Sequence, residues 1–377
     1  MTGQHRASYF VALTTPGQLK PLDGLRAVAI LLVLMTHIVQ QIPGVSYVAW
    51  NTEWATPLYT GWIGVDLFFV LSGFLVGGVV LRAIVQDRFS FRTFYLRRFF
   101  RILPAYLAVI LMLCATRMAW PASGGVPRFA LRDVLPNVLL LTDYLPSDIG
   151  VPSWSLSIEE HFYILIPLLL FATRKLQPAI RRNLLLSFVF LALFSRMLTY
   201  RTFSLGDATP GPAILQLIYF PFHNRMDSLA IGVLVALVHQ DHYDSAFESL
   251  RGVAGALGVL LTGFVFLTGA LKGGWLETTL QYSLLACGFG AILWSVLPAQ
   301  PITALARILS SKYWVPVARL SYSLYLTHLV VLHFTGEATR QMALAPVVMF
   351  VCCIGISLPL FLFVEDPLHR YARRAFN

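Results

Sequence analysis

The chain has 377 residues, of which 57% are hydrophobic and only 12% are charged. Soluble domains carry about 25% charged residues, so this composition excludes a soluble protein of two or three domains. The formal net charge of +10 would suit nucleic-acid binding, but the basic residues lie between long apolar segments, which is typical of cytoplasmic membrane loops. The four cysteines stand in apolar stretches without ligand spacing, so they predict neither a metal site nor a disulfide.

Long apolar segments recur along the whole chain, and segments of about 17–25 apolar residues suit helices that span a bilayer. The sequence therefore predicts an all-α, polytopic integral membrane protein in which residues 1–377 form a single transmembrane domain. The polar segment 1–20 lacks a signal-peptide core, and the tail 365–377 follows the last helix. About ten spans are expected, near 22–42, 61–82, 99–118, 153–172, 183–201, 217–239, 252–271, 278–297, 314–334 and 344–364.

The stretch 119–152 interrupts this pattern of spans. It contains five prolines and one apolar piece, 134–141, which is too short to cross a bilayer. We expect an outer loop here that holds an interfacial or re-entrant segment.

Basic residues are concentrated in alternate loops, as the positive-inside rule requires of cytoplasmic loops. This bias places both termini in the cytoplasm and predicts a multi-pass protein of the cell membrane. The residues that carry the bias are Arg82, Arg88, Arg92, Arg97, Arg98, Arg101, Arg174, Lys175, Arg181, Arg182, Arg370, Arg373 and Arg374.

The first predicted span contains two ionisable residues, Arg26 near its start and His37 deep inside. Such groups cost several kcal/mol in hydrocarbon, so an intramembrane ionisable residue carries a functional hypothesis by default. Ten residues separate the two, which is about three helical turns or roughly 16 Å and places both on nearly the same helix face. One helix face therefore connects the cytoplasmic edge to a titratable group in the membrane interior.

Six other ionisable side chains lie inside predicted spans at a depth comparable with that of His37. Counted at about 1.5 Å per residue in a core about 30 Å thick, they fall in one layer nearer the outer face. They are Asp66, Glu159, Glu160, Arg225, Asp227 and His328.

Each of these groups also fits a simpler role. A lone histidine in a helix bundle is often a packing residue, and Glu159 and Glu160 can complement the dipole at a helix start. Arg225 and Asp227 can form a structural ion pair. The coincidence of all these groups in depth favours a functional site.

Six short motifs stand in the order found in membrane-bound acyltransferase family 3, which the chain resembles from about Leu22 to Pro367. This family comprises O-acyltransferases that modify cell-surface glycans and some small molecules. The motifs are Leu22-Asp23-Gly24-Leu25-Arg26 with His37 after ten intervening residues, Gly64 to Leu75, Arg98-Phe99-Phe100-Arg101 with Pro104, Trp154 to Glu160, Ser321 to His328, and Glu365-Asp366-Pro367.

The resemblance implies acetyl-CoA or another acyl-CoA as co-substrate. It also implies a hydroxyl acceptor outside the cytoplasm, most often a polysaccharide or a lipid-linked glycan. No metal and no nucleic-acid partner are expected. The phosphates of CoA require cations, and Arg97, Arg98 and Arg101 share one helix face by their spacing, with Arg26 at the inner edge of the His37 face. The same three arginines can also serve as topology signals alone.

His37 is the expected catalytic centre, either as general base on the acceptor hydroxyl or as transient carrier of the acyl group. Glu160 is expected to orient or charge-balance a histidine, or to act as a base partner, and Arg26 to guide the donor. Acceptor binding or support of the catalytic pair is assigned to Asp66, Ser72, Glu159, Arg225, Asp227, Tyr322, Tyr325 and His328.

The chain departs from the family's pattern where His161, in place of the usual glutamine, follows the glutamate pair. We expect this substitution to tune the pocket. Two other functions compete with glycan acylation. A transporter or flippase would use the buried charges as a pathway and would show inverted repeats, which are not clearly visible in the sequence. An acyltransferase acting on a small molecule or a lipid is the second alternative.

Overall fold

The computed structural model describes residues 20–42, 53–119, 131–145, 147, 152–203, 211–241, 250–269, 274–297, 303–339 and 341–376. Within these ranges the chain is helical and contains no β-strand, which confirms the predicted all-α class. The expected N-terminal cytoplasmic segment lies outside the described residues except for its last residue, Lys20.

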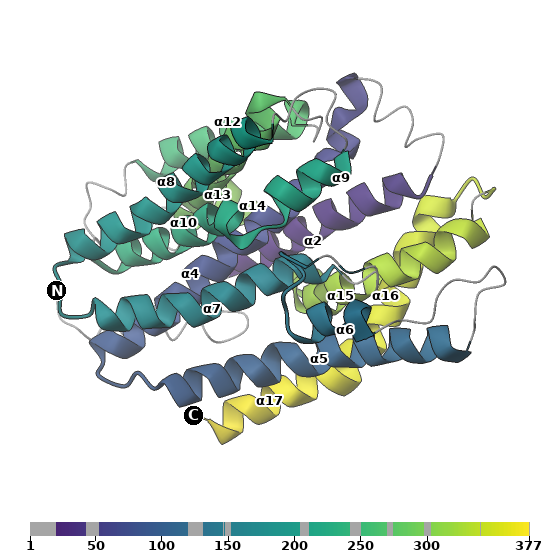
Figure 1. The fold of residues 1–377 in the computed structure, drawn as a ribbon, viewed down its shortest axis with the longest axis horizontal. Coiled ribbons are helices and arrows are strands. Elements are labelled where there is room, and N and C mark those ends of the chain that lie inside the picture. The colour runs from purple at the N-terminus through teal and green to yellow at the C-terminus, as the bar shows by residue number, and fades with distance from the viewer. Residues whose placement is uncertain are drawn as a thin grey trace.

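The long helices run roughly along the longest axis of the molecule (Figure 1). The α-helices are α2 (Lys20–Gln40), α4 (Ile63–Val85), α5 (Phe91–Ala119), α6 (Leu131–Val138), α7 (Ser153–Ala172), α8 (Pro178–Thr202), α9 (Gly211–Ile214), α10 (Phe222–Asp241), α12 (Arg251–Thr268), α13 (Gln281–Val296), α14 (Ala304–Leu309), α15 (Trp314–Thr339), α16 (Ala345–Leu360) and α17 (Asp366–Ala375). Two short 3₁₀ helices, η1 (Glu53–Leu58) and η2 (Thr60–Trp62), precede α4.

Nine helices in the described ranges are long and apolar enough to cross a membrane, which confirms a polytopic membrane protein. They correspond to nine of the ten expected spans. The tenth, 217–239, overlaps α10, which is as long as a span but begins with a polar sequence. With the polar residues Asn224, Arg225, Asp227 and Ser228 in its first two turns, α10 is not among the described helices that are apolar enough to cross a membrane.

Large apolar side chains are exposed along the outer helices, for example Phe194 on α8, Leu260 on α12 and Val351 on α16. A soluble monomer rarely exposes a contiguous apolar surface of this kind. These faces suit contact with lipid acyl chains. The apolar residues that do not pack in the core of the bundle thus cover its outer surface.

Helix α4 lies at the centre of the bundle and packs against α2, α7, α10 and α13. Two of its glycines permit close approach. A Cβ atom on Gly73 would lie 2.0 Å from the Leu229 carbonyl oxygen, and one on Gly64 would lie 2.3 Å from the Ala29 carbonyl oxygen. Small residues let helix backbones approach closely in membranes. This packing holds α2 and α10, which carry several candidate residues, against one central helix.

Only part of the expected outer loop 119–152 lies within the described residues, and that part folds back onto α7. Its helix α6 has 8 residues, too few to cross a bilayer. Ser153 Oγ donates to Asn137 Oδ1 at 2.8 Å, and the Thr142 amide donates to Ser157 Oγ at 3.2 Å. The position of this segment relative to the bilayer stays a prediction.

The described part of the chain contains three π-helical turns: η3 (Leu215–Tyr219), η4 (Leu276–Leu280) and η5 (Phe361–Glu365). Single π-turns are often found at functional sites because they reorient side chains and free a carbonyl group. Here they place Tyr219, the Thr279 carbonyl and Glu365 beside buried polar groups.

Candidate active site

Two histidines from different helices meet at one end of the candidate site. His37, in the last turn of α2, and His328, on α15, have ring centroids 4.9 Å apart at an interplanar angle of 63°. His328 is fully buried, whereas His37 is half-buried. The two histidines that were expected at one depth are therefore in direct contact.

Both imidazole rings direct Nδ1 at a backbone carbonyl oxygen. The distance is 2.8 Å from His37 to Val33 and 2.7 Å from His328 to Tyr325. Because a carbonyl oxygen only accepts, Nδ1 carries the proton, and Nε2 of each neutral ring carries the lone pair. Nε2 of His328 is buried without a hydrogen-bond partner among the described residues. A half-buried His37 with a basic Nε2 can take a proton from a hydroxyl or accept an acyl group.

The face of α15 that carries His328 continues with Tyr325 and Tyr322, at successive spacings of three residues. The Tyr325 hydroxyl hydrogen-bonds to Ser155 Oγ on α7. The Tyr322 hydroxyl donates to the Ile102 carbonyl oxygen on α5 at 2.8 Å. Hydrogen-bonding groups therefore follow one another along α15 at intervals of about 4.5 Å.

Two glutamates on α7 lie beyond these tyrosines. Glu159 accepts a hydrogen bond of 2.8 Å from the Tyr163 hydroxyl, and Ser72 Oγ on α4 lies 2.6 Å from the same hydroxyl. The Arg98 guanidinium carbon is 5.0 Å from the Tyr163 ring centroid, and Glu160 interacts electrostatically with Glu159 and Arg98. Tyr163 joins Ser72 to Glu159 and was missed in the sequence, although it lies one turn after Glu159 on the same helix face.

Three of the four expected donor-binding arginines lie close together. Arg26 on α2 is within electrostatic range of Arg98 and Arg101 on α5. The guanidinium of Arg97 donates to the carbonyl oxygen of Phe376, at the end of the C-terminal helix. The assignment of Arg97 to the donor stays a prediction.

The candidate residues form a path along the bundle rather than the single layer that we expected. Glu159 and Glu160 are within electrostatic range of Tyr322, whereas His37 contacts His328, about 9 Å further along α15. The depth count assumed that every span begins at a membrane surface. Helix α7 instead begins near the middle of the long axis (Figure 1), which moves its glutamates toward the other end.

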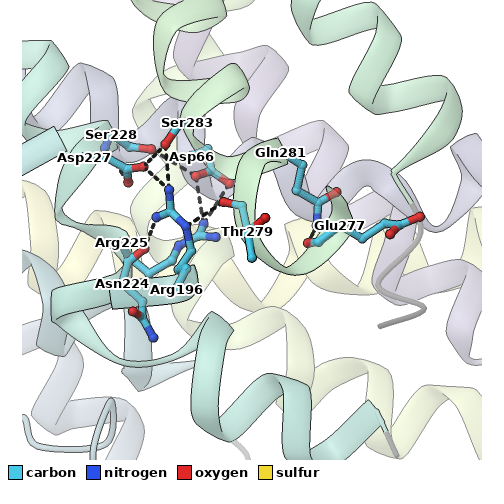
Figure 2. Close-up of polar contacts among 10 residues, drawn as sticks. All are labelled: Asp66, Arg196, Asn224, Arg225, Asp227, Ser228, Glu277, Thr279, Gln281 and Ser283. Atoms are coloured by element: carbon cyan, nitrogen blue, oxygen red, sulfur yellow. Dashed lines mark hydrogen bonds and ion pairs between the residues drawn. The ribbon is translucent and has the colours of Figure 1, made fainter. Parts of the chain in front are cut away.

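A buried ion pair joins α4 to α10 (Figure 2). Arg225 Nη2 lies 2.8 Å from both carboxylate oxygens of Asp66, and Ser228 Oγ donates to Asp66 at 3.0 Å. The guanidinium carbon lies 4.7 Å and 4.2 Å from the ring centroids of Tyr219 and Tyr282. Nε and Nη1 have no hydrogen-bond partner among the described residues, and the two ring faces supply part of their stabilisation.

A second buried pair joins α8 to α10 (Figure 2). Arg196 Nη2 donates to Asp227 Oδ2 at 2.8 Å and to Ser283 Oγ at 2.6 Å. Its Nε donates to the Thr279 carbonyl oxygen at 2.8 Å, and its Nη1 donates to the Asn224 carbonyl oxygen. The Thr279 carbonyl belongs to the π-turn η4, so the backbone of this turn and the Asp227 carboxylate both hold the Arg196 guanidinium.

The direct Arg225–Asp227 ion pair that we considered from the sequence was wrong. Each residue pairs with another helix instead: Arg225 with Asp66 on α4, and Asp227 with Arg196 on α8. Arg196 was missed, although an arginine five residues inside the end of the predicted span 183–201 was a usable signal.

A smaller polar group connects the folded-back segment to α7 and α10. His161 Nδ1 lies 3.2 Å from Asp143 Oδ2, and the Tyr144 hydroxyl is 2.9 Å from His223 Nδ1. The rings of Tyr144 and His223 are nearly parallel, with centroids 5.7 Å apart. Burial raises the pKa of Tyr144, so its phenol stays protonated at neutral pH. The histidine that replaces the family's glutamine therefore has a carboxylate partner.

In chemical terms, the arrangement offers cationic groups at one end, hydrogen-bonding tyrosines along the path and a basic imidazole at the other end. No group of three or more His, Cys, Asp or Glu side chains that could hold a metal ion occurs in the described part of the chain.

Comparison with known proteins gives relatives that are named O-acetyltransferases. O-acetyltransferase OatA of Staphylococcus aureus strain NCTC 8325 is 25% identical over 389 residues, which cover 96% of this chain and 59% of that protein. A protein of strain COL, provisionally named an O-acetyltransferase, is 26% identical over 383 residues, which cover 94% of this chain and 58% of that protein. The chain thus spans about three-fifths of the length of these relatives.

No solved structure shows significant similarity to the chain. Residues 20–365 match the family described as the acyltransferase domain, and the match covers the helices that carry His37, Glu160 and His328. Because this match includes most of the chain, the protein belongs to the membrane-bound acyltransferase family 3 that its motifs resemble.

Proposed function

We propose that the protein is a membrane O-acyltransferase that moves an acyl group, most simply acetyl, from cytoplasmic acyl-CoA to a hydroxyl of an extracytoplasmic acceptor. The observation that carries this proposal is the state and position of the His37 ring. Its Nε2 has the lone pair, its ring is half-buried, and the same helix carries Arg26 at the other end. The names of the relatives, which specify O-acetyl transfer, support acetyl as the group.

The donor is expected to enter at the arginine end. Arg26, Arg98 and Arg101 come from two helices, and guanidinium groups suit the phosphates of CoA. The pantetheine arm of CoA carries two amides, which require hydrogen-bond partners inside the bundle. The path along α15, with Tyr322 and Tyr325, offers hydroxyl groups for such an arm.

Two chemical routes fit a lone pair on Nε2 of His37. In the first, Nε2 takes the proton of the acceptor hydroxyl, whose oxygen attacks the thioester carbonyl. The carbon–sulfur bond then breaks, and the CoA sulfur leaves as a thiolate that receives the proton. In the second, Nε2 itself attacks the thioester carbonyl, the carbon–sulfur bond breaks and CoA leaves as a thiolate. The acylated imidazole then passes the group to the acceptor oxygen, whose proton goes to the thiolate. His328, packed edge-on against His37, limits the rotation of the ring in both routes.

Glu160, Glu159 and Ser72 support the donor side of the path in this proposal, because they lie near Arg98 rather than at the histidine pair. The buried pairs of Asp66 with Arg225 and of Asp227 with Arg196 support the helices. The acceptor reaches His37 from the end of α2 that we expect to face outward. A polysaccharide or lipid-linked glycan is the acceptor that the family resemblance favours, and the cell membrane is the expected location.

The test uses the full chain, purified in detergent or reconstituted in liposomes, with radiolabelled acetyl-CoA and a soluble glycan acceptor. We expect His37→Ala to abolish transfer to the acceptor while expression and the thermal unfolding midpoint stay as in the wild type. His333→Ala is the matched control, because His333 is an exposed histidine on α15. Full transfer by His37→Ala would refute the central role of this residue.

Labelling of the wild type in the absence of acceptor separates the two routes. An acyl-imidazole route predicts that wild-type protein incubated with acetyl-CoA alone carries label on residue 37, which peptide mass spectrometry after rapid quenching would locate. A general-base route predicts no label there until the acceptor is added. Mass spectrometry of extracytoplasmic glycans from cells with and without the gene then identifies the ester that depends on the protein.

A further inference from the structure

Beyond the arginines of α2 and α5, three arginines from α15 and α17 reach the same end of the bundle. We propose that Arg319, Arg370 and Arg373 bind the phosphates of the donor's nucleotide end and, with Arg98 and Arg101, form its docking site. This inference rests on the proposed acyl-CoA donor. It gives a donor-binding role to arginines of the C-terminal helix α17, which the sequence identified only as topology signals.

Helix α17 presents one charged face. Asp366, His369, Arg370 and Arg373 follow at spacings of three, four and seven residues, which places them on one side of a helix. The helix packs alongside the first half of α5 (Figure 1). The contact includes the rings of Phe100 and Tyr371, whose centroids are 5.4 Å apart. The charged face of α17 is therefore fixed next to the arginines of α5.

A single carboxylate positions two of the guanidinium groups. Asp366 Oδ2 lies 2.5 Å from Arg370 Nη2, and Asp366 Oδ1 lies 3.7 Å from Arg319 Nη2. The side chains of Arg370 and Arg319 remain 60% and 52% exposed, whereas that of Asp366 is only 14% exposed. One carboxylate cannot neutralise two guanidinium groups, so both keep donors for an anion.

Arg98, Arg101 and Arg373 lie around His369, next to the pair of Arg319 and Arg370. His369 is within electrostatic range of Arg98, Arg101 and Arg373, and Asp23 on α2 is within range of Arg319. Within the described residues, no carboxylate lies within ion-pair distance of Arg101 or Arg373. A topology signal requires only that basic residues lie on one side of the membrane. Their convergence from four helices onto one site indicates a polyanionic ligand in addition.

The chemistry of the ligand follows from this arrangement. CoA has a diphosphate and a separate 3′-phosphate, and guanidinium groups bind phosphate oxygens through paired, charge-assisted hydrogen bonds. Phosphate is also present in the headgroups of anionic lipids at the inner membrane surface, which attract arginine. Both sources share one chemistry, and the binding experiment must separate them.

The experiment measures equilibrium binding of CoA and dephospho-CoA to the full chain in a zwitterionic detergent without anionic lipid. Each charge-assisted contact contributes about 1.5–3 kcal/mol, and 1.4 kcal/mol is tenfold, so Arg370→Gln and Arg373→Gln should each raise the Kd for CoA about tenfold or more. We expect the preference for CoA over dephospho-CoA to shrink in at least one variant. Arg319→Gln is the second variant should a change in α17 disturb the helix.

Arg182→Gln is the matched control, because it removes one exposed arginine at the start of α8, away from α17. It should bind CoA as the wild type does. In the transfer assay, the α17 variants should raise KM for acetyl-CoA with little change in kcat, which is the signature of lost ground-state binding.

Kd values for CoA within about twofold of the wild type in all three variants would overturn the docking site. The proposal that acyl-CoA is the donor would still hold if the wild type transfers the acetyl group of acetyl-CoA. Variants that bind CoA normally but lose affinity for nanodiscs containing phosphatidylglycerol would show a lipid site and would also overturn the inference. A wild type that neither binds CoA nor transfers its acyl group would instead refute the proposed donor.

Discussion

Replacement of Arg196 by methionine tests whether the buried pairs stabilise the bundle. Arg196 is 0% exposed, and its guanidinium donates four hydrogen bonds, to Asp227, Ser283 and two backbone carbonyl oxygens. Methionine retains the apolar part of the side chain and removes all four. Asp227 keeps the Ser283 hydroxyl and the Ser228 amide as donors, but it loses its counter-charge in a site without solvent.

Removal of one partner of a buried ion pair costs about 3–5 kcal/mol, because the other charge is left uncompensated. We therefore expect Arg196→Met to lower the free energy of unfolding by that amount. For proteins of 150–250 residues, 1 kcal/mol shifts the Tm by about 2–4 °C, and the shift per kcal/mol decreases with size. For this longer chain we expect the Tm in detergent to fall by at least about 5 °C.

Arg201→Met is the control, since Arg201 is an exposed arginine near the end of the same helix. The double variant Arg196→Met with Asp227→Leu removes both charges and should recover about 2 kcal/mol or more, as apolar replacements of buried pairs often do. The assay is thermal unfolding of the purified chain, followed by intrinsic fluorescence. If Arg196→Met costs no more than Arg201→Met, or if the double variant is less stable than the single one, the reasoning is refuted.

Two further predictions concern packing and the folded-back segment. Gly73→Ala should destabilise the chain by about 1–3 kcal/mol, since its Cβ would lie 2.0 Å from a backbone oxygen, whereas Gly355→Ala, which meets open space inside α16, should not lower the Tm. Asp143→Asn removes the charge beside His161 and should speed proteolysis between residues 131 and 145. A cleavage rate equal to that of the wild type would contradict this role for the pair.

Much of the helical framework could be predicted from hydropathy. Helix α7 begins and ends where the expected span 153–172 does, and α15 includes the whole expected span 314–334. The reason is that hydrocarbon offers no hydrogen-bond partner, so an apolar segment of this length satisfies its backbone by forming a helix. Segment length and composition are local properties, and they appear directly in the sequence.

The candidate site was predictable only in part. The spacing of Arg26 and His37 and the motif around His328 singled out α2 and α15. In the structure these two helices pack together, and His37 contacts His328. The spacing on α5 places three arginines on one helix face, but it does not show that Arg97 donates to the Phe376 carbonyl oxygen. Residues on one helix face, which is about 100° wide, can contact different partners, because packing sets the rotation of each helix about its axis.

Hydropathy and residue type alone predict an all-α membrane protein, most of its apolar helices and the ionisable groups inside them. Which of those groups meet depends on how the helices pack in the folded chain. Arg225 pairs with Asp66 rather than with Asp227, and Arg196 joins the buried network from a helix whose pattern is otherwise apolar. Burial of a charge is stable only with a partner, and the partners come from helices far apart in the chain, at positions set by packing between helices.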